Sequence, residues 1–200
     1  MPAPAPEKEF RRAVFLDRDG TLIEEKEYLH QPEDVAYFPQ AIHALARLDQ
    51  AGFLLFLVTN QSGVGRGYFT LNDVDRVHHR IAADLAAQGV QFQKIYVAPE
   101  HPDQPSVGRK PSPHFLFAAR DEFGLDLSAS YMIGDKWIDL QCGWNAGVAR
   151  SILVRTGYGR SVEKENPPGL DRAIVKDGLI DAAEWILDHS PQTESRPGPA

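Results

Sequence analysis

Short apolar runs alternate with stretches of helical periodicity along most of this chain. The runs that predict strands are residues 13–16, 53–58, 92–97, 131–133 and 152–154. Two of them, 13–16 and 53–58, are apolar at every position, which is typical of parallel strands buried on both faces. The sequence therefore favours a sheet with helices on both sides over a half-exposed antiparallel sheet.

Apolar residues recur at helical spacing between these runs. Helices are predicted at about residues 39–51, 70–88, 112–123, 136–146 and 179–189. Thr70 is a suitable N-cap for the second helix, and Gly124 can end the third. The alternation of strand and helix predicts an α/β fold of three layers, Rossmann-like and doubly wound around a mainly parallel sheet.

The length of 200 residues suits one compact domain. Residues 1–9 and 190–200 are rich in Pro, Ala, Ser and Gly and cannot bury enough apolar surface to offset their ordering entropy. We therefore expect a domain at residues 10–189 between two disordered tails. The short intervals between the predicted strands leave little room for a separate cap domain.

The net charge and the lengths of the apolar runs argue against nucleic acids and membranes as partners of this chain. The net charge of −7 disfavours a nucleic-acid partner, because phosphate backbones attract basic faces. The longest apolar run, residues 53–58, is far shorter than the roughly 20 residues needed to span a bilayer. The first six residues lack the layout of a secretion signal. We expect a cytoplasmic monomer that binds neither membrane nor nucleic acid.

Two carboxylates follow the first buried strand. Asp17 and Asp19 stand two positions apart in Asp17-Arg18-Asp19-Gly20-Thr21. Two acids this close would repel each other in a dry pocket unless a cation lies between them or one is protonated. Both arrangements serve phosphoryl transfer, because Mg²⁺ prefers oxygen ligands and a protonated acid can assist a leaving alkoxide. Standing alone, the run could also be a solvated Asp-Gly turn.

Three further polar clusters lie at or after the ends of other predicted strands. They are Thr59-Asn60-Gln61, the Arg109-Lys110 pair, and Gly134-Asp135-Lys136 with Asp139 one helical turn later. Each is ordinary turn, surface or helix-start chemistry when taken by itself. Because ligands of such sheets bind outside the carboxyl ends of the strands, the four clusters together predict one metal and phosphate site.

The order of these clusters resembles the four motifs of the phosphatases of the haloacid dehalogenase (HAD) superfamily. The resemblance runs from about Arg12 to about Arg155 and is highly specific. Residues 17–21, 24–39, 59–67 and 109–111 are similar to a narrower branch. That branch comprises the D-glycero-D-manno-heptose-1,7-bisphosphate phosphatases, which remove the 7-phosphate, and the related histidinol-phosphate phosphatases.

The resemblance implies a role for each residue. Asp17 would be the nucleophile that forms an aspartyl-phosphate, and Asp19 the acid and base. Mg²⁺ would be held by Asp17, by the carbonyl of Asp19 and by Asp135, with Lys136 and Asp139 in supporting roles. The remaining expected contacts are with phosphate, from Thr59, Asn60 and Lys110, and with the rest of a small phosphorylated sugar or alcohol, from Gln61, Arg66 and Arg109.

One stretch departs from the branch. Many members carry a zinc loop of three cysteines and a histidine before the Arg-Lys pair. Here those positions hold Ala98, Ser106 and Gly108, with Glu100 in place of the histidine, and Cys142 is the only cysteine of the chain. One imidazole, of His101, and one carboxylate cannot form a closed tetrahedral zinc site, so we expect no zinc.

Two alternatives stay open: one concerns the substrate of the phosphatase, and the other concerns whether the protein is an enzyme at all. One is a phosphatase of histidinol phosphate or of another small phosphate ester. The other is a receiver-type switch, which also accepts phosphate on an aspartate at a strand end. In that design the phosphorylated aspartate follows a later strand than the acid pair, whereas Asp17 and Asp19 fit a nucleophile with its own acid.

Overall fold

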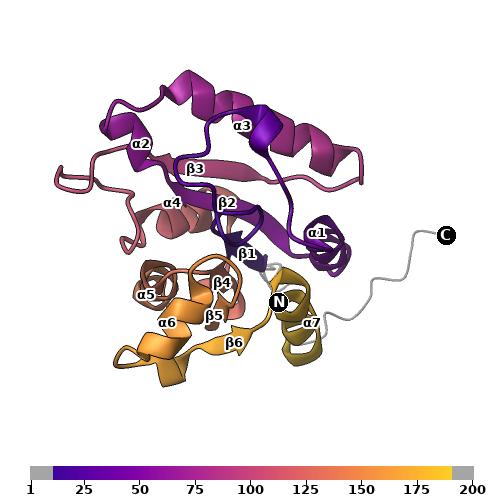
Figure 1. Ribbon diagram of the computed structural model, residues 1–200. Helices are drawn as coiled ribbons and strands as arrows, with labels where there is room; N and C mark the ends of the chain where they lie inside the picture. Colours follow the sequence, from indigo (N-terminus) through magenta and orange to yellow (C-terminus); the bar gives the residue numbers. More distant parts are fainter. Residues whose placement is uncertain (1–10, 191–200) are drawn as a thin grey trace, which may run out of the picture.

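Six parallel strands form one sheet in the order β3-β2-β1-β4-β5-β6 (Figure 1). The computed structural model describes residues 11–190. Its strands are β1 (Ala13–Leu16), β2 (Leu54–Asn60), β3 (Lys94–Ala98), β4 (Tyr131–Gly134), β5 (Arg150–Val154) and β6 (Ile174–Lys176). Because the chain continues on opposite sides of β1, the carboxyl end of β1 lies at the switch point where such sheets bind ligands.

Helices cover both faces of the sheet, which confirms the predicted three-layer α/β fold (Figure 1). On one face lie α1 (Ala41–Gln50), α3 (Leu71–Ala86) and α7 (Leu179–His189). On the other face lie α4 (His114–Phe123), α5 (Trp137–Ala146) and α6 (Gly159–Glu165). Short helical turns complete the chain: α2 (Ser62–Gly65), η1 (Pro32–Asp34), η2 (Leu127–Ala129) and η3 (Leu170–Arg172).

The apolar run of β1 is buried on both sides. Val14 and Leu16 belong to the core cluster under α1, α3 and α7, whereas Ala13 and Phe15 belong to the cluster under α4 and α5. Successive side chains of a strand point to opposite faces, so a central strand between two helical layers must be apolar at every position. This is the physical origin of the pattern from which the sheet was predicted.

Helix boundaries follow the expected chemistry at two positions. Thr70 accepts a hydrogen bond from the backbone N–H of Asp73, and the Asp73 carboxylate accepts one from the N–H of Thr70, so α3 begins with a capping box. Gly124 ends α4 in the left-handed conformation that glycine adopts without strain. Both predictions are confirmed.

Other boundaries and elements differ from the prediction. Thr59 and Asn60 belong to β2 itself instead of following it. The sequence did not predict α2, α6 or β6. The expected tails at 1–9 and 190–200 lie outside the described residues, apart from Ser190, which directly follows α7.

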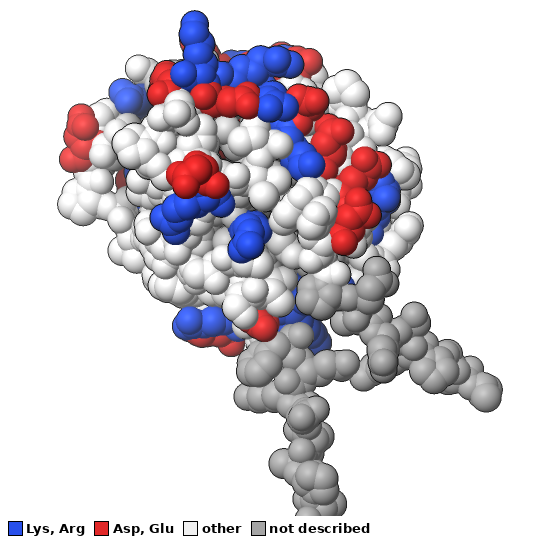
Figure 2. Space-filling view, turned by 90° about the horizontal axis from the view of Figure 1, so that it is seen from below, with Lys and Arg blue, Asp and Glu red and all other residues white. Residues whose placement is uncertain are grey.

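Charges of both signs are mixed on the surface. Figure 2 shows Lys and Arg side by side with Asp and Glu on the face that is seen from below in the view of Figure 1. Within residues 11–190, no helix is both long and apolar enough to cross a membrane. Most of the buried polar and charged side chains of the described residues lie at the sheet's carboxyl edge.

Candidate active site

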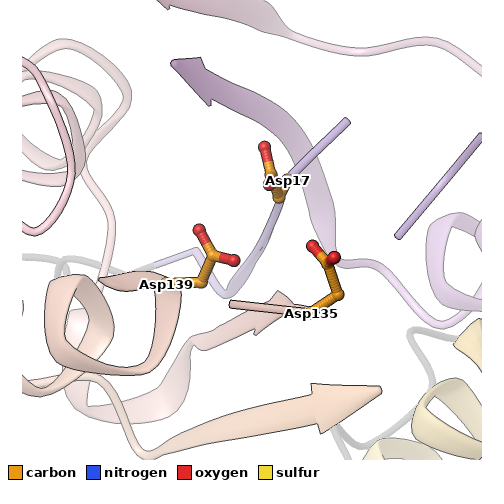
Figure 3. A group of neighbouring side chains, drawn as sticks. All are labelled: Asp17, Asp135 and Asp139. Carbon is orange, nitrogen blue, oxygen red and sulfur yellow. The ribbon is translucent and has the colours of Figure 1, made fainter. Parts of the chain in front are cut away.

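Three buried carboxylates meet beyond the carboxyl ends of β1 and β4. Asp17 follows β1, Asp135 follows β4, and Asp139 projects from the first turn of α5 (Figure 3). One oxygen from each lies within 4.8 Å of the others. The structure therefore brings together Asp17 and Asp135, whose carboxylates were expected to bind the metal, and Asp139, which was expected in a supporting role.

Lys110 is the buried cation of this group. Its ammonium nitrogen lies 2.7 Å from Oδ1 of Asp17 and 2.7 Å from Oδ1 of Asp139, and the residue is 2% exposed. The Asp17 oxygen also accepts a hydrogen bond of 2.8 Å from the backbone N–H of Arg18. One oxygen of Asp17 is thus fixed by two donors, which orients the carboxylate within the site.

The pKa values follow from burial and from this distribution of charge. Burial raises the pKa of Asp17, but the cations Lys110 and Lys136 outweigh it, so the pKa lies below its usual value. Burial and the negative charges of Asp17 and Asp139 raise the pKa of Asp135 to about 8. A carboxyl group with a raised pKa resists ionisation until positive charge is added, and a divalent cation bound by the oxygen ligands would let all three carboxylates ionise together.

Asp135 lies against a backbone turn after β5 that was not among the predicted site residues. Its Oδ2 accepts a hydrogen bond of 2.8 Å from the N–H of Tyr158, in the loop after β5. A Cβ atom on Gly20 or on Gly157 would overlap this carboxylate, and both glycines have positive φ angles, of 83° and 52°. The two glycines let two loops close around one acid. Thr156 ties these loops together with a hydrogen bond to the Gly20 carbonyl.

The side chain of Asp19 is held apart from the three carboxylates. Arg18 donates to it from Nε, at 2.9 Å, and from Nη2, at 3.1 Å. Gln61 donates a third hydrogen bond, of 2.9 Å, to Oδ2 of Asp19. The acid is thus oriented separately from the group that could hold a metal, as different roles for Asp17 and Asp19 require.

Gln61 connects Asp19 to Thr59. Its Nε2 donates to Oγ1 of Thr59 at 2.8 Å, while its Oε1 accepts from Arg18 at 3.1 Å. Because Thr59 accepts at its oxygen, its hydroxyl proton is directed elsewhere and can serve a phosphate. Both polar atoms of Gln61 are used inside the protein, so the geometry favours a positioning role over the direct substrate contact that the sequence predicted.

Asn60 has a similar internal role. Its Oδ1 accepts a hydrogen bond from the Lys110 backbone N–H at 3.0 Å, and its Nδ2 donates to the Lys110 carbonyl at 3.3 Å. This pair of bonds fixes the loop that carries Lys110 to the end of β2. The geometry thus favours Asn60 as a support for Lys110 over the expected phosphate contact.

A cavity of about 310 Å³ opens above Asp19. It is lined mainly by polar and charged residues from the loops after β1, β2 and β4, together with Tyr158. Lys136 lies at its edge, with its ammonium 3.0 Å from Glu25 and 4.9 Å from the centre of the Tyr158 ring. The cavity has the size and polarity of a site for a small phosphorylated molecule.

Arg66 and Arg109, the two expected substrate-binding arginines, do not line this cavity. Burial and then the positive charge of Arg66 lower the pKa of Arg109, and the charge of Glu100 opposes this. Nη1 of Arg109 is buried and has no hydrogen-bond partner among residues 11–190. Two neighbouring cations with an unused donor are suited to an anion.

The stretch that departs from the zinc loop is joined by side-chain hydrogen bonds. Ser106 Oγ donates to the Glu100 carboxylate at 2.7 Å and accepts from the backbone N–H of Arg109 at 3.1 Å. These bonds connect the two ends of the loop directly. Its zinc content stays a prediction.

Comparisons with known proteins relate this site to one enzyme family. A family model described as HAD-hydrolase-like matches residues 107–182. The chain is 38% identical over 184 residues to a D-glycero-beta-D-manno-heptose-1,7-bisphosphate 7-phosphatase of Escherichia coli (strain K12), covering 88% of each chain. It is 38% identical over 191 residues to the D-glycero-D-manno-heptose-1,7-bisphosphate 7-phosphatase of Thermosynechococcus vestitus, covering 90% of this chain and 97% of the relative.

A solved structure agrees with these relatives. The D,D-heptose 1,7-bisphosphate phosphatase from B. bronchiseptica, complexed with magnesium and phosphate, superposes with a TM-score of 0.83 at 30% identity. The match covers 90% of this chain and 99% of that one. The expected superfamily and fold are therefore confirmed by both sequence and structure.

Proposed function

Because this chain belongs to the HAD-superfamily family of heptose-1,7-bisphosphate 7-phosphatases, we propose that it removes the 7-phosphate of D-glycero-D-manno-heptose 1,7-bisphosphate with the help of Mg²⁺. The observation that carries this proposal is the ion pair of 2.7 Å between Lys110 and Asp17, inside a group of three buried carboxylates. A nucleophilic carboxylate, a cation for the phosphoryl group and oxygen ligands for a metal are all within one site.

In the proposed first step, the free carboxylate oxygen of Asp17 attacks the phosphorus. The bond from phosphorus to the sugar oxygen breaks, and that oxygen takes its electron pair and a proton from Asp19. Lys110 and the Thr59 hydroxyl stabilise the charge on the transferring group. The product is an aspartyl-phosphate on Asp17.

In the second step, water attacks the same phosphorus and gives its proton to the Asp19 carboxylate. The bond from phosphorus to Asp17 breaks, which releases inorganic phosphate and restores both aspartates. The carboxylates of Asp17 and Asp135 and the Asp19 carbonyl would hold Mg²⁺, with Asp139 orienting Lys110. When bound, the ion supplies positive charge that neutralises the phosphate oxygens.

Arg66 and Arg109 are the proposed contacts for the second phosphate. The buried, unpaired Nη1 of Arg109 and its repulsion from Arg66 support this, because an anion between them would relieve both. Lys136, at the edge of the cavity, is an additional cation for the sugar phosphate.

A substrate panel tests the proposal. Phosphate release is measured with heptose 1,7-bisphosphate and with histidinol phosphate, in Mg²⁺ and in excess chelator. We expect Mg²⁺-dependent release with the bisphosphate preferred in kcat/KM. A hundredfold preference for histidinol phosphate would refute the substrate, and a phospho-aspartate stable for minutes would point to the receiver-type switch instead.

The loop at residues 98–110 is proposed to fold without zinc. The contact of 2.7 Å between Ser106 and Glu100 supports this, because it joins parts of the loop that a metal would otherwise bridge. Metal analysis of the purified protein tests it, and one zinc ion per chain would contradict it.

We further propose that the enzyme acts in the cytoplasm as a monomer. Subcellular fractionation would test the compartment, and light scattering would test the oligomeric state.

A further inference from the structure

Among residues 11–190, Arg18 is the largest side chain that is fully buried. The residue is 1% exposed, although it stands between the two aspartates of the site and lines the cavity. A buried guanidinium costs several kcal/mol of hydration unless its N–H groups are paired. Where these groups donate therefore indicates what the residue does.

Two of its nitrogens are directed at one residue. Nε donates to Oδ2 of Asp19 at 2.9 Å and Nη2 donates to Oδ1 at 3.1 Å, which is the two-pronged contact that an arginine makes with a carboxylate. Such a contact fixes both the position and the rotation of the carboxylate plane. A lysine at this position could fix only one oxygen.

The rest of the guanidinium is fixed from three other elements. Nη2 also donates to the carbonyl of Leu29 at 3.3 Å and to Oε1 of Gln61 at 3.1 Å. Nη1 lies 3.4 Å from Nε2 of His78, a buried residue of α3. Arg18 is therefore held by the loop after β1, the end of β2 and a helix on the sheet's face.

His78 can accept from Arg18 only in its neutral form. Burial, followed by the charges of Arg18 and His79, lowers the pKa of His78 to about 3. The ring is therefore neutral at physiological pH, and in the tautomer with its proton on Nδ1 the Nε2 atom can accept a hydrogen bond from the Arg18 guanidinium. A protonated imidazole would repel the guanidinium instead.

We propose that Arg18 is a positioning residue, aligned by His78 and Gln61, that holds Asp19 in the orientation from which it gives a proton to the leaving oxygen. The proposal rests on the proposed function, because it concerns the acid of that reaction. It goes beyond it by assigning to Arg18 and His78 a part in the expulsion of poor leaving groups. The contacts of Arg18 with Asp19 and Gln61, and of Gln61 with Thr59, carry it.

The test compares substrates that differ in their need for an acid. A p-nitrophenyl phosphate has a leaving group that departs without a proton, whereas heptose bisphosphate releases an alkoxide that needs one. The value of kcat/KM covers the steps up to departure of the leaving group, so it isolates the role of Asp19 as an acid. It is measured for wild type, Arg18→Lys, Asp19→Asn and the double variant.

We expect Arg18→Lys to lower kcat/KM about a hundredfold with the sugar phosphate and less than about threefold with the aryl phosphate, since general acid catalysis contributes about 10²–10⁴-fold. In the Asp19→Asn background, Arg18→Lys should have almost no further effect. Equal losses on both substrates in a folded protein, or full additivity with Asp19→Asn, would overturn the proposal. If wild type hydrolyses neither substrate, the proposed function fails instead.

A second set of three variants tests the proposal if Arg18→Lys does not fold. His78→Leu removes the acceptor, His78→Gln keeps one, and His79→Leu is the matched control, because His79 is the exposed neighbour on the same helix. We expect His78→Leu to lose about tenfold on the sugar phosphate alone, as a small displacement of a catalytic group would, and His78→Gln to recover most of it. Three indistinguishable variants would overturn the proposal.

Discussion

The carboxylate of Asp139 lies 2.7 Å from the ammonium group of Lys110, with both side chains buried. This contact ties the first turn of α5 to the loop that precedes α4. It also explains why a lysine can remain charged in the core. Burial lowers its pKa, but Asp139 and Asp17 more than reverse this and raise the pKa above its usual value.

Replacing Asp139 by Asn should misplace Lys110 without removing it. We expect kcat to fall about a hundredfold, because a displacement of about 1 Å in a catalytic group costs that much. Steady-state kinetics measure this, with Asp188→Asn, an exposed position on α7, as the matched control. Activity of Asp139→Asn within threefold of wild type would contradict the role assigned to the contact.

Asp17→Asn should abolish turnover and leave the fold intact. An amide cannot attack phosphorus, so phosphate release should fall by about 10⁴-fold or more. The circular dichroism spectrum should match that of wild type. Wild-type activity in this variant would exclude the covalent mechanism.

Gly157→Ala should displace the Asp135 carboxylate from its present position. The new Cβ would overlap the Asp135 carboxylate and would also stand at a φ of 52°. The left-handed backbone of an alanine should lower the free energy of unfolding by about 1–2 kcal/mol. Displacement of the Asp135 carboxylate should also lower kcat and raise the Mg²⁺ concentration needed for half-maximal activity.

Gly89→Ala separates the two effects. Gly89 has a φ of 72°, and nothing lies within 4 Å of its Cβ position. This variant should lose the same stability in thermal unfolding and keep full activity. Equal activity losses in Gly157→Ala and Gly89→Ala would show that the close contact of Gly157 with Asp135 is not needed for activity.

His78 should make the protein less stable in mild acid. Its folded pKa of about 3 lies below the usual value of 6.5, so the unfolded chain binds a proton that the folded chain does not. The contribution of His78 to the free energy of unfolding should therefore fall as the pH drops from about 6.5 toward 3, by up to about 1.4 kcal/mol per pH unit.

Denaturant titrations between pH 7 and pH 5 measure this slope, above the range where most carboxylates titrate. His78→Gln lacks this titrating group, so its free energy of unfolding should fall less steeply with decreasing pH than that of wild type, by up to the difference of one bound proton. An unchanged slope in His78→Gln would show that His78 is not held neutral in the folded protein.

The sequence predicted the centre of the fold better than its margins. The bounds of β1 and α7 agree with the prediction, because β1 is apolar throughout and α7 carries a clear apolar stripe. The strand β6 was missed because its three residues are only half buried and lie at the sheet's edge. The turn α2 contains two glycines, and α6 is mainly polar, so neither gives an amphipathic signal.

For the site, the sequence indicated which acids and cations come together but not what holds them. Asp17, Lys110 and Asp135 were predicted as neighbours from their places after strands. The role of Arg18 was missed because its partners, among them His78 and Gln61, lie far from it in the sequence. The Tyr158 N–H was missed because a backbone group leaves no mark in the sequence, although Gly157 after β5 is a signal that could have indicated it.

Within residues 11–190 the chain forms one sheet with helices on its faces, and the cavity of about 310 Å³ opens directly to solvent. Asp19, the proposed acid and base, lines this cavity, so an intermediate on the nearby Asp17 should be attacked by small nucleophiles that diffuse in as well as by water. In concentrated methanol or glycerol, part of the phosphoryl group should pass to the alcohol and emerge as an alkyl phosphate. The ratio of alkyl phosphate to inorganic phosphate would then measure how freely solvent molecules reach the intermediate.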